Sequence, residues 1–211
     1  MLAQFLSAFV TLFVVIDPPG CAPIYAGLTV DASAAQRRAM ALRAATIAGL
    51  ILLVFALFGE RLLGALHIEL DSFRIAGGIM LFAIAIEMVF EKRTERRHER
   101  ADKLRAQHAA TPDVDDVSVF PMAMPMLAGP GAIASIMLLM ARAERIEQTG
   151  AILAALLLVI VCTLAAMLAA APLMRLFGQQ FEAVVTRVLG VILAALATQF
   201  VIDGVRGSFG L

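Results

Sequence analysis

Two interruptions of long apolar segments restrict the folds open to this chain. The first, residues 16–23 with the sequence IDPPGCAP, places an aspartate and three prolines inside the first apolar segment, and the second, residues 125–131 with the sequence PMLAGPG, lies in a later one. Proline donates no backbone hydrogen bond and disfavours helix in the residue before it, so each interruption predicts two half-helices with a bend between them. Because lipid offers no partner for the freed backbone groups, both breaks must line a protein-enclosed cavity if they lie at membrane depth.

The composition places the chain in a membrane. Of its 211 residues 61% are hydrophobic and 16% are charged, and the mean hydropathy is +0.90, whereas a soluble domain has roughly 45–50% apolar residues. The formal net charge of zero gives no sign of a nucleic-acid partner. Two cysteines in apolar stretches and three scattered histidines predict neither a disulfide framework nor a metal site, and we expect no cofactor.

Six apolar stretches predict an all-α polytopic membrane protein with six transmembrane helices, because about 20 residues cross a bilayer core. We interpret the start of the chain as an uncleaved first span, since it lacks a basic leader. The expected spans are 2–29 with the first break, 44–59 with extensions at both ends, 73–90, 117–141 with the second break, 150–174 and 183–202. Polar connections are expected at 31–43, 60–71 and 175–182, with a short polar tail at the end. Residues 91–116 are interpreted as a charged cytoplasmic linker.

The distribution of arginine and lysine predicts the orientation. The connections at 31–43, 91–117 and 175–182 would share one side of the membrane, and they hold roughly twice the basic residues of the opposite set. Basic residues in short loops stay on the cytoplasmic side. Both termini are therefore predicted to be periplasmic.

The two halves of the chain share an order of features that indicates an internal repeat. Pro19-Gly20 matches Pro130-Gly131 at an offset of 111, and a Glu-x4-Arg-x2-Gly pattern at 69–77 recurs at 182–190 with an offset of 113. Within a single membrane domain, 1–211, we predict a three-helix repeat at 1–90 and a second at 117–211. Three spans per repeat invert one repeat relative to the other about an axis in the membrane plane. The alternative is a chance match in a chain rich in alanine, leucine and glycine.

The residues and helix starts at the two breaks indicate which charges a ligand there would carry. A half-helix that begins after a break presents unpaired N–H groups and the positive end of its dipole, which favour an anion such as a carboxylate. Asp17 offers the opposite charge, so the pair of breaks suits a zwitterion. An ionisable group inside a membrane is a functional candidate, and the alternative is that Asp17 only caps the following half-helix. Ser135 and Thr46 are polar enough to line a path, although interhelical hydrogen bonding explains them equally well.

The candidate substrate-binding residues are therefore Asp17, Pro19, Gly20, Cys21, Ala128, Gly129, Pro130, Gly131, Ser135 and Thr46.

The motifs DPPGxxPI at 17–24, RIAGG at 74–78 and LAGPGAI at 127–133 resemble those of the MarC family of bacterial inner-membrane proteins, within the lysine-exporter-like transporter superfamily. The resemblance covers nearly the whole chain. It implies a six-span inverted-repeat carrier in the bacterial inner membrane, with some members moving small neutral amino acids such as glycine, alanine, serine and threonine, often outward. Three positions depart from the family pattern: Cys21 stands where asparagine is usual, Tyr25 where phenylalanine is common, and Ser135 where many relatives have threonine.

The leading hypothesis is a secondary transporter, with export the expected direction, that carries small neutral amino acids by alternating access. An efflux carrier for other small molecules and a non-transporting membrane scaffold are the alternatives. Enzymatic activity is not expected, because hydrolysis needs an activated nucleophile or paired carboxylates at membrane depth. The substrate, the coupling ion and the oligomeric state, a homo-oligomer included, stay open.

Overall fold

The computed structural model describes residues 2–90 and 116–210, and for 171–182 it describes the backbone only. Its elements are α1 (Leu2–Ile16), α2 (Pro18–Leu28), α3 (Ala34–Ala65), α4 (Leu70–Val89), the irregular segment η1 (Ser118–Leu127), α6 (Pro130–Met140), α7 (Ile146–Leu168) and α8 (Ala170–Phe209). Five stretches are long and apolar enough to cross a membrane, or six if the bent pair of η1 and α6 counts as one span. The all-α, multi-span expectation is thus confirmed, whereas the inversion of the two halves stays a prediction. Of the expected linker at 91–116, residues 91–115 lie outside the described residues.

Both predicted breaks interrupt helical segments. α1 and α2 meet at Asp17, and η1 and α6 meet at residues 128–129 with a bend of 53°. η1 is wide and irregular: its N–H groups reach back five residues, from Met122 to Val117 at 3.2 Å and from Ala128 to Ala123 at 2.9 Å. Two prolines inside η1 remove the donors that a regular α-helix would use here.

The expected polar connection at 31–43 is wrong for most of its length. Ser33 accepts a hydrogen bond from the backbone of Gln36, and the Gln36 side chain accepts one from the backbone of Ser33. This capping box satisfies two donors at the helix start, so α3 begins at Ala34 and its first three turns carry the arginines. The connection at 60–71 is also shorter than expected, since α3 continues to Ala65 and α4 begins at Leu70.

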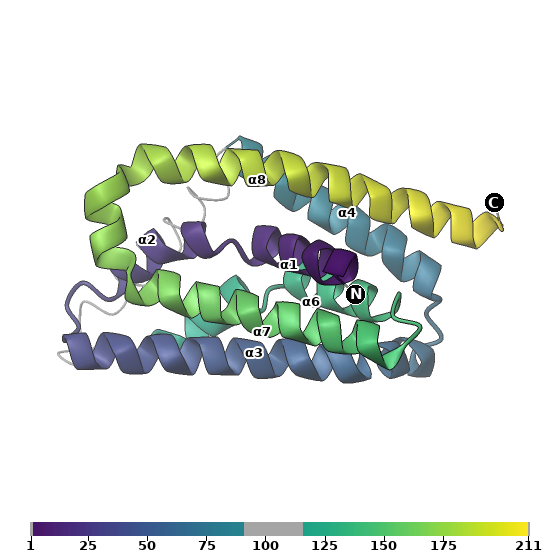
Figure 1. Ribbon diagram of the computed structural model, residues 1–211, viewed down its shortest axis with the longest axis horizontal. Coiled ribbons are helices and arrows are strands. Elements are labelled where there is room, and N and C mark those ends of the chain that lie inside the picture. Colours follow the sequence, from purple (N-terminus) through teal and green to yellow (C-terminus); the bar gives the residue numbers. More distant parts are fainter. Residues whose placement is uncertain (1, 91–115, 211) are drawn as a thin grey trace.

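The expected connection at 175–182 and the polar tail are also helical. Only Ala169 separates α7 from α8, and α8 continues to Phe209. Figure 1 shows that α8 first turns away from the axis of α7 and then runs back along α4. The part of α8 that is apolar enough to span a membrane is Ala183–Phe209.

The broken spans lie between two pairs of long helices. α4 packs along α8 on one side of the molecule and α3 contacts α7 on the other (Figure 1). α1 and α2 pack on α7, while η1 and α6 pack on α3, so the broken span of each half contacts the middle helix of the other half. The large side chains that are fully buried come from all of these elements and include Leu12, Ile16, Ile24, Leu52, Leu81, Leu127, Ile136 and Ile152.

Glycine permits the close approach of α4 and α8. A methyl group on Gly78 would lie 2.8 Å from the carbonyl oxygen of Ala197, and one on Gly190 would lie 3.2 Å from that of Ala85. Small residues at such crossings let helix backbones pack in lipid, where no hydrophobic effect drives helices together. Large apolar side chains such as Leu50, Leu57, Val161 and Val191 point outward and are more than one third exposed, as expected for a surface that faces lipid.

Candidate functional site at the two helix breaks

The first break is built around Asp17, which is only 1% exposed. Pro18 and Pro19 supply no N–H, so the backbone leaves the α-helical path, and Asp17 adopts the left-handed conformation with φ 60° and ψ 65°. Aspartate tolerates this region better than most residues. Its Oδ1 accepts a hydrogen bond from the Gly20 N–H at 3.2 Å, so the carboxyl group caps α2.

Gly20 is required by this cap. A Cβ atom at position 20 would lie 2.2 Å from Oδ2 of Asp17, which is far inside van der Waals contact. The aspartate and the glycine three residues later therefore form one structural unit. The capping role that the sequence left as an alternative is present in the structure.

Cys21 occupies a position where the family pattern usually has asparagine. Because the Gly20 N–H bonds to Asp17, it does not bond to the carbonyl of Ile16 four residues back, as it would in a continuous helix. The Sγ of Cys21 donates to that carbonyl instead, at 3.4 Å. The thiol is fully buried, so its contact lies inside the break and not on the surface.

The second break lacks such a cap. Gly129 is the N-cap residue of α6 and has no side chain to accept a hydrogen bond, so the N–H groups of Gly131 and Ala132 in the first turn have no side-chain cap. A methyl group on Gly131 would lie 3.4 Å from Cγ1 of Val15 at the end of α1. The start of α6 and the end of α1 therefore lie side by side, and the structure brings the two breaks together.

The other candidate positions differ in burial. Ala128 and Ser135 are buried, Pro19 and Gly129 are half-buried, and Pro130 is exposed. The Ser135 hydroxyl is fully buried and has no hydrogen-bond partner among the described residues. Buried hydroxyl groups are normally paired, so this group is available to a ligand or to water. Thr46 does not join the site, because its side chain is exposed on α3.

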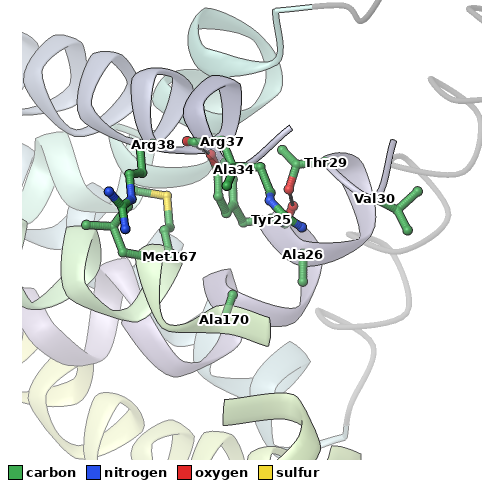
Figure 2. A pocket seen from close by; sticks show the side chains of 10 residues that line it. Tyr25, Ala26, Thr29, Val30, Ala34, Arg37, Arg38, Met167 and Ala170 are labelled. Atoms are coloured by element: carbon green, nitrogen blue, oxygen red, sulfur yellow. Dashed lines mark hydrogen bonds between the residues drawn. The ribbon is translucent and has the colours of Figure 1, made fainter. Parts of the chain in front are cut away.

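A cavity of about 320 Å³ lies at one end of the molecule, where no sequence motif predicted one. It is lined by Tyr25, Ala26, Thr29, Val30, Ala34, Arg37, Arg38, Met167, Leu168 and Ala170. Figure 2 shows Tyr25 between the Arg37 and Arg38 side chains, and the tyrosine hydroxyl donates to the carbonyl of Arg37. In the sequence, the single tyrosine and the adjacent basic residues Arg37 and Arg38 mark the residues that line this cavity.

Ion pairs join elements at the two ends of the molecule. Arg43 on α3 pairs with Asp116. Hydrogen bonding by Ser118, whose backbone N–H donates to Oδ1 of Asp116 at 3.0 Å, and this guanidinium hold the pKa of Asp116 below its usual value. At the other end Arg142, just after α6, pairs with Asp203 on α8 and lies 4.8 Å from the ring centre of Phe200. Among the described residues no group of three histidine, cysteine or acidic side chains is placed to hold a metal ion.

These features define a polytopic helical membrane protein with two broken helices, in which Asp17 is buried at one break and Ser135 in the helix that follows the other. The family model described as MarC family integral membrane protein matches residues 2–209. The chain therefore belongs to the MarC family, as its motifs predicted.

Its relatives carry general names. The chain is 35% identical over 207 residues to the UPF0056 membrane protein MJ1677 of Methanocaldococcus jannaschii, covering 98% of both chains. It is 32% identical to the UPF0056 membrane protein YhcE of Escherichia coli K12, covering 95% of this chain and 91% of that one, and 32% identical to the UPF0056 inner membrane protein YhgN of the same organism, covering 96% of both. No solved structure matches this chain.

Proposed function

We propose that this protein is a secondary transporter of small neutral amino acids, such as glycine, alanine, serine or threonine, with its substrate site at the two breaks. The observation that carries the proposal is the pairing of unlike helix starts. One has a buried carboxyl group at Asp17, and the other, at the start of α6, has backbone N–H groups without a side-chain cap. A zwitterion matches both: its carboxylate suits the helix start and its ammonium group suits Asp17.

The size of the substrate follows from the packing around the second break. Gly131 lies against Val15, Leu81 and Ile84, which approach the position of a Cβ atom at 3.4, 3.5 and 2.6 Å. Such close apolar walls favour an amino acid with a small side chain. They also require the walls to separate before a ligand reaches α6, which is the motion that alternating access supplies.

Reciprocal packing supports the inverted repeat on which alternating access would depend. α1 and α2 contact α7 in the way that η1 and α6 contact α3, and α4 pairs with its counterpart α8. A two-fold axis in the membrane plane would exchange the members of each pair. We place residues 91–116 in the cytoplasm, both termini in the periplasm and the protein in the inner membrane, with outward transport as the expected direction.

The direct test is flux across a membrane. The purified protein is reconstituted into liposomes loaded with radiolabelled glycine, alanine, serine or threonine, and efflux is compared with that of protein-free liposomes and with that of liposomes holding Asp17→Asn. We expect efflux of at least one of the four amino acids from the native protein, none from protein-free liposomes, and efflux at least roughly tenfold slower with Asp17→Asn. Efflux equal to that of protein-free liposomes for all four overturns the proposed cargo.

A further inference from the structure

The cavity beside Tyr25 lies where the ends of four helices meet. Its lining comes from the last turn of α2 and the turn after it, the first turns of α3, the end of α7 and the first residue of α8. Helix ends of a membrane-spanning bundle lie at the depth of the lipid headgroups. The positive end of the α3 dipole lies on the same side, because Ala34 is the first residue of that helix.

The polar part of the lining is basic. Arg37 and Arg38 both line the cavity, and neither makes an ion pair with a carboxylate in the described part of the chain. Figure 2 shows one guanidinium on the Thr29 side of Tyr25 and the other on the opposite side, near Met167. No acidic residue is among the lining residues that the structure describes. An anion placed here would meet two guanidinium groups, whose donors match the oxygens of a phosphate.

The apolar part of the lining favours a lipid over a soluble substrate as the ligand of this cavity. Val30 is 55% exposed and Leu168 is 47% exposed, so the wall of the cavity is continuous with the outer apolar surface. A site for a soluble amino acid would be enclosed between the two halves of the molecule, as the breaks are. A phospholipid needs both features together, a basic recess for its phosphate and an open apolar flank for its acyl chains.

We propose that this cavity binds the phosphate group of an anionic phospholipid. The guanidinium groups of Arg37 and Arg38 hold the phosphate oxygens, and the acyl chains lie along Val30 and Leu168. The bound lipid joins α2, α3 and the end of α7 at this end of the molecule. The inference does not depend on what the breaks transport.

Native mass spectrometry of the full chain in a neutral detergent tests the proposal. The protein is titrated separately with phosphatidylglycerol, cardiolipin and phosphatidylcholine of matched acyl chains. We expect the two anionic lipids to be retained and phosphatidylcholine to be lost at the same collision energy. The double substitution Arg37→Gln with Arg38→Gln should weaken retention of the anionic lipids roughly 30-fold, because each basic residue near an anionic surface contributes roughly fivefold.

Matched controls keep the result interpretable. Arg61→Gln with Arg145→Gln removes the same charge from the opposite end of the molecule and should leave retention unchanged. Ala34→Trp fills part of the cavity at an exposed position without changing charge, and it should also reduce retention. Circular dichroism establishes that each variant is folded.

Three results would overturn the proposal. One is equal retention of anionic and zwitterionic lipids. Another is equal loss in both arginine pairs, which would indicate charge in general and not this cavity. The third is displacement of the anionic lipids by millimolar inorganic phosphate, which would assign the cavity to a free anion and not to a lipid.

Discussion

Two substitutions of Asp17 separate its capping role from a role in transport. An asparagine at position 17 would keep a side-chain oxygen for the Gly20 N–H and would tolerate the left-handed backbone at φ 60°, so Asp17→Asn should leave stability within about 0.5 kcal/mol of the native value. Asp17→Ala loses the cap, which costs roughly 1 kcal/mol, and places alanine in a left-handed conformation, which costs roughly 1 kcal/mol more. The expected loss is about 2 kcal/mol, or roughly 4–8 °C in the midpoint of thermal unfolding.

Circular dichroism in detergent measures the midpoint of thermal unfolding, because the sequence has no tryptophan whose fluorescence could be followed instead. Efflux from liposomes, normalised to the amount of folded protein, measures transport. We expect Asp17→Asn to unfold like the native protein and to transport at least roughly tenfold more slowly, because it removes the charge but not the cap. Native flux in Asp17→Asn would show that Asp17 is only a cap, and an unchanged midpoint in Asp17→Ala would refute the capping argument.

Three further predictions concern packing, acid stability and thiol access. Gly78→Ala should destabilise the protein by roughly 1–3 kcal/mol, because the added methyl group meets the backbone of α8. Gly150→Ala, which has open space around it, should be neutral or stabilising by at most about 1 kcal/mol. Thermal unfolding of the two variants measures the difference. The lowered pKa of Asp116 means that its interactions with Ser118 and Arg43 add stability above the pKa of the unfolded chain, which is about 4. This stability is lost as the pH falls through the lower folded value. Asp116→Asn should therefore unfold at a lower temperature than the native protein at neutral pH, and the difference should shrink as the pH is lowered below about 4. A maleimide should modify Cys162, which is half-buried, long before the fully buried Cys21, as peptide mass spectrometry would show; equal rates would contradict the burial of the first break.

The breaks could be predicted because proline acts locally. The prolines at positions 18, 19 and 130 have no N–H to continue a preceding helix, and the structure begins a new helix at Pro18 and at Pro130. Pro23, by contrast, lies inside α2 and does not end it. The connections could not be predicted equally well from polarity. Charged residues such as Arg37 and Arg43 form helix readily, so the start of α3 depends on the capping box at Ser33 and not on the end of the apolar run.

The sequence could not show which face of each helix points into the protein, nor a cavity that several helices form together. Thr46 and Ser135 both look like polar residues in apolar helices, yet one is exposed and the other fully buried, because the packing of each helix decides which face points inward. The cavity beside Tyr25 depends on where α7 ends relative to α3, a distance that no local pattern records.

The first break has a side-chain cap and the second does not, because of the packing around the second break. The position that caps α6 is Gly129, and an aspartate there would place its Cβ atom 2.5 Å from the carbonyl oxygen of Pro125, a backbone atom that cannot move aside easily. The second break therefore excludes the kind of cap that Asp17 provides at the first. Its helix start stays without a side-chain carboxyl group, so in the proposed transporter the N–H groups of Gly131 and Ala132 would receive the carboxylate of the substrate. Asp17, which already caps α2, would then meet the cationic end of the same substrate or a proton.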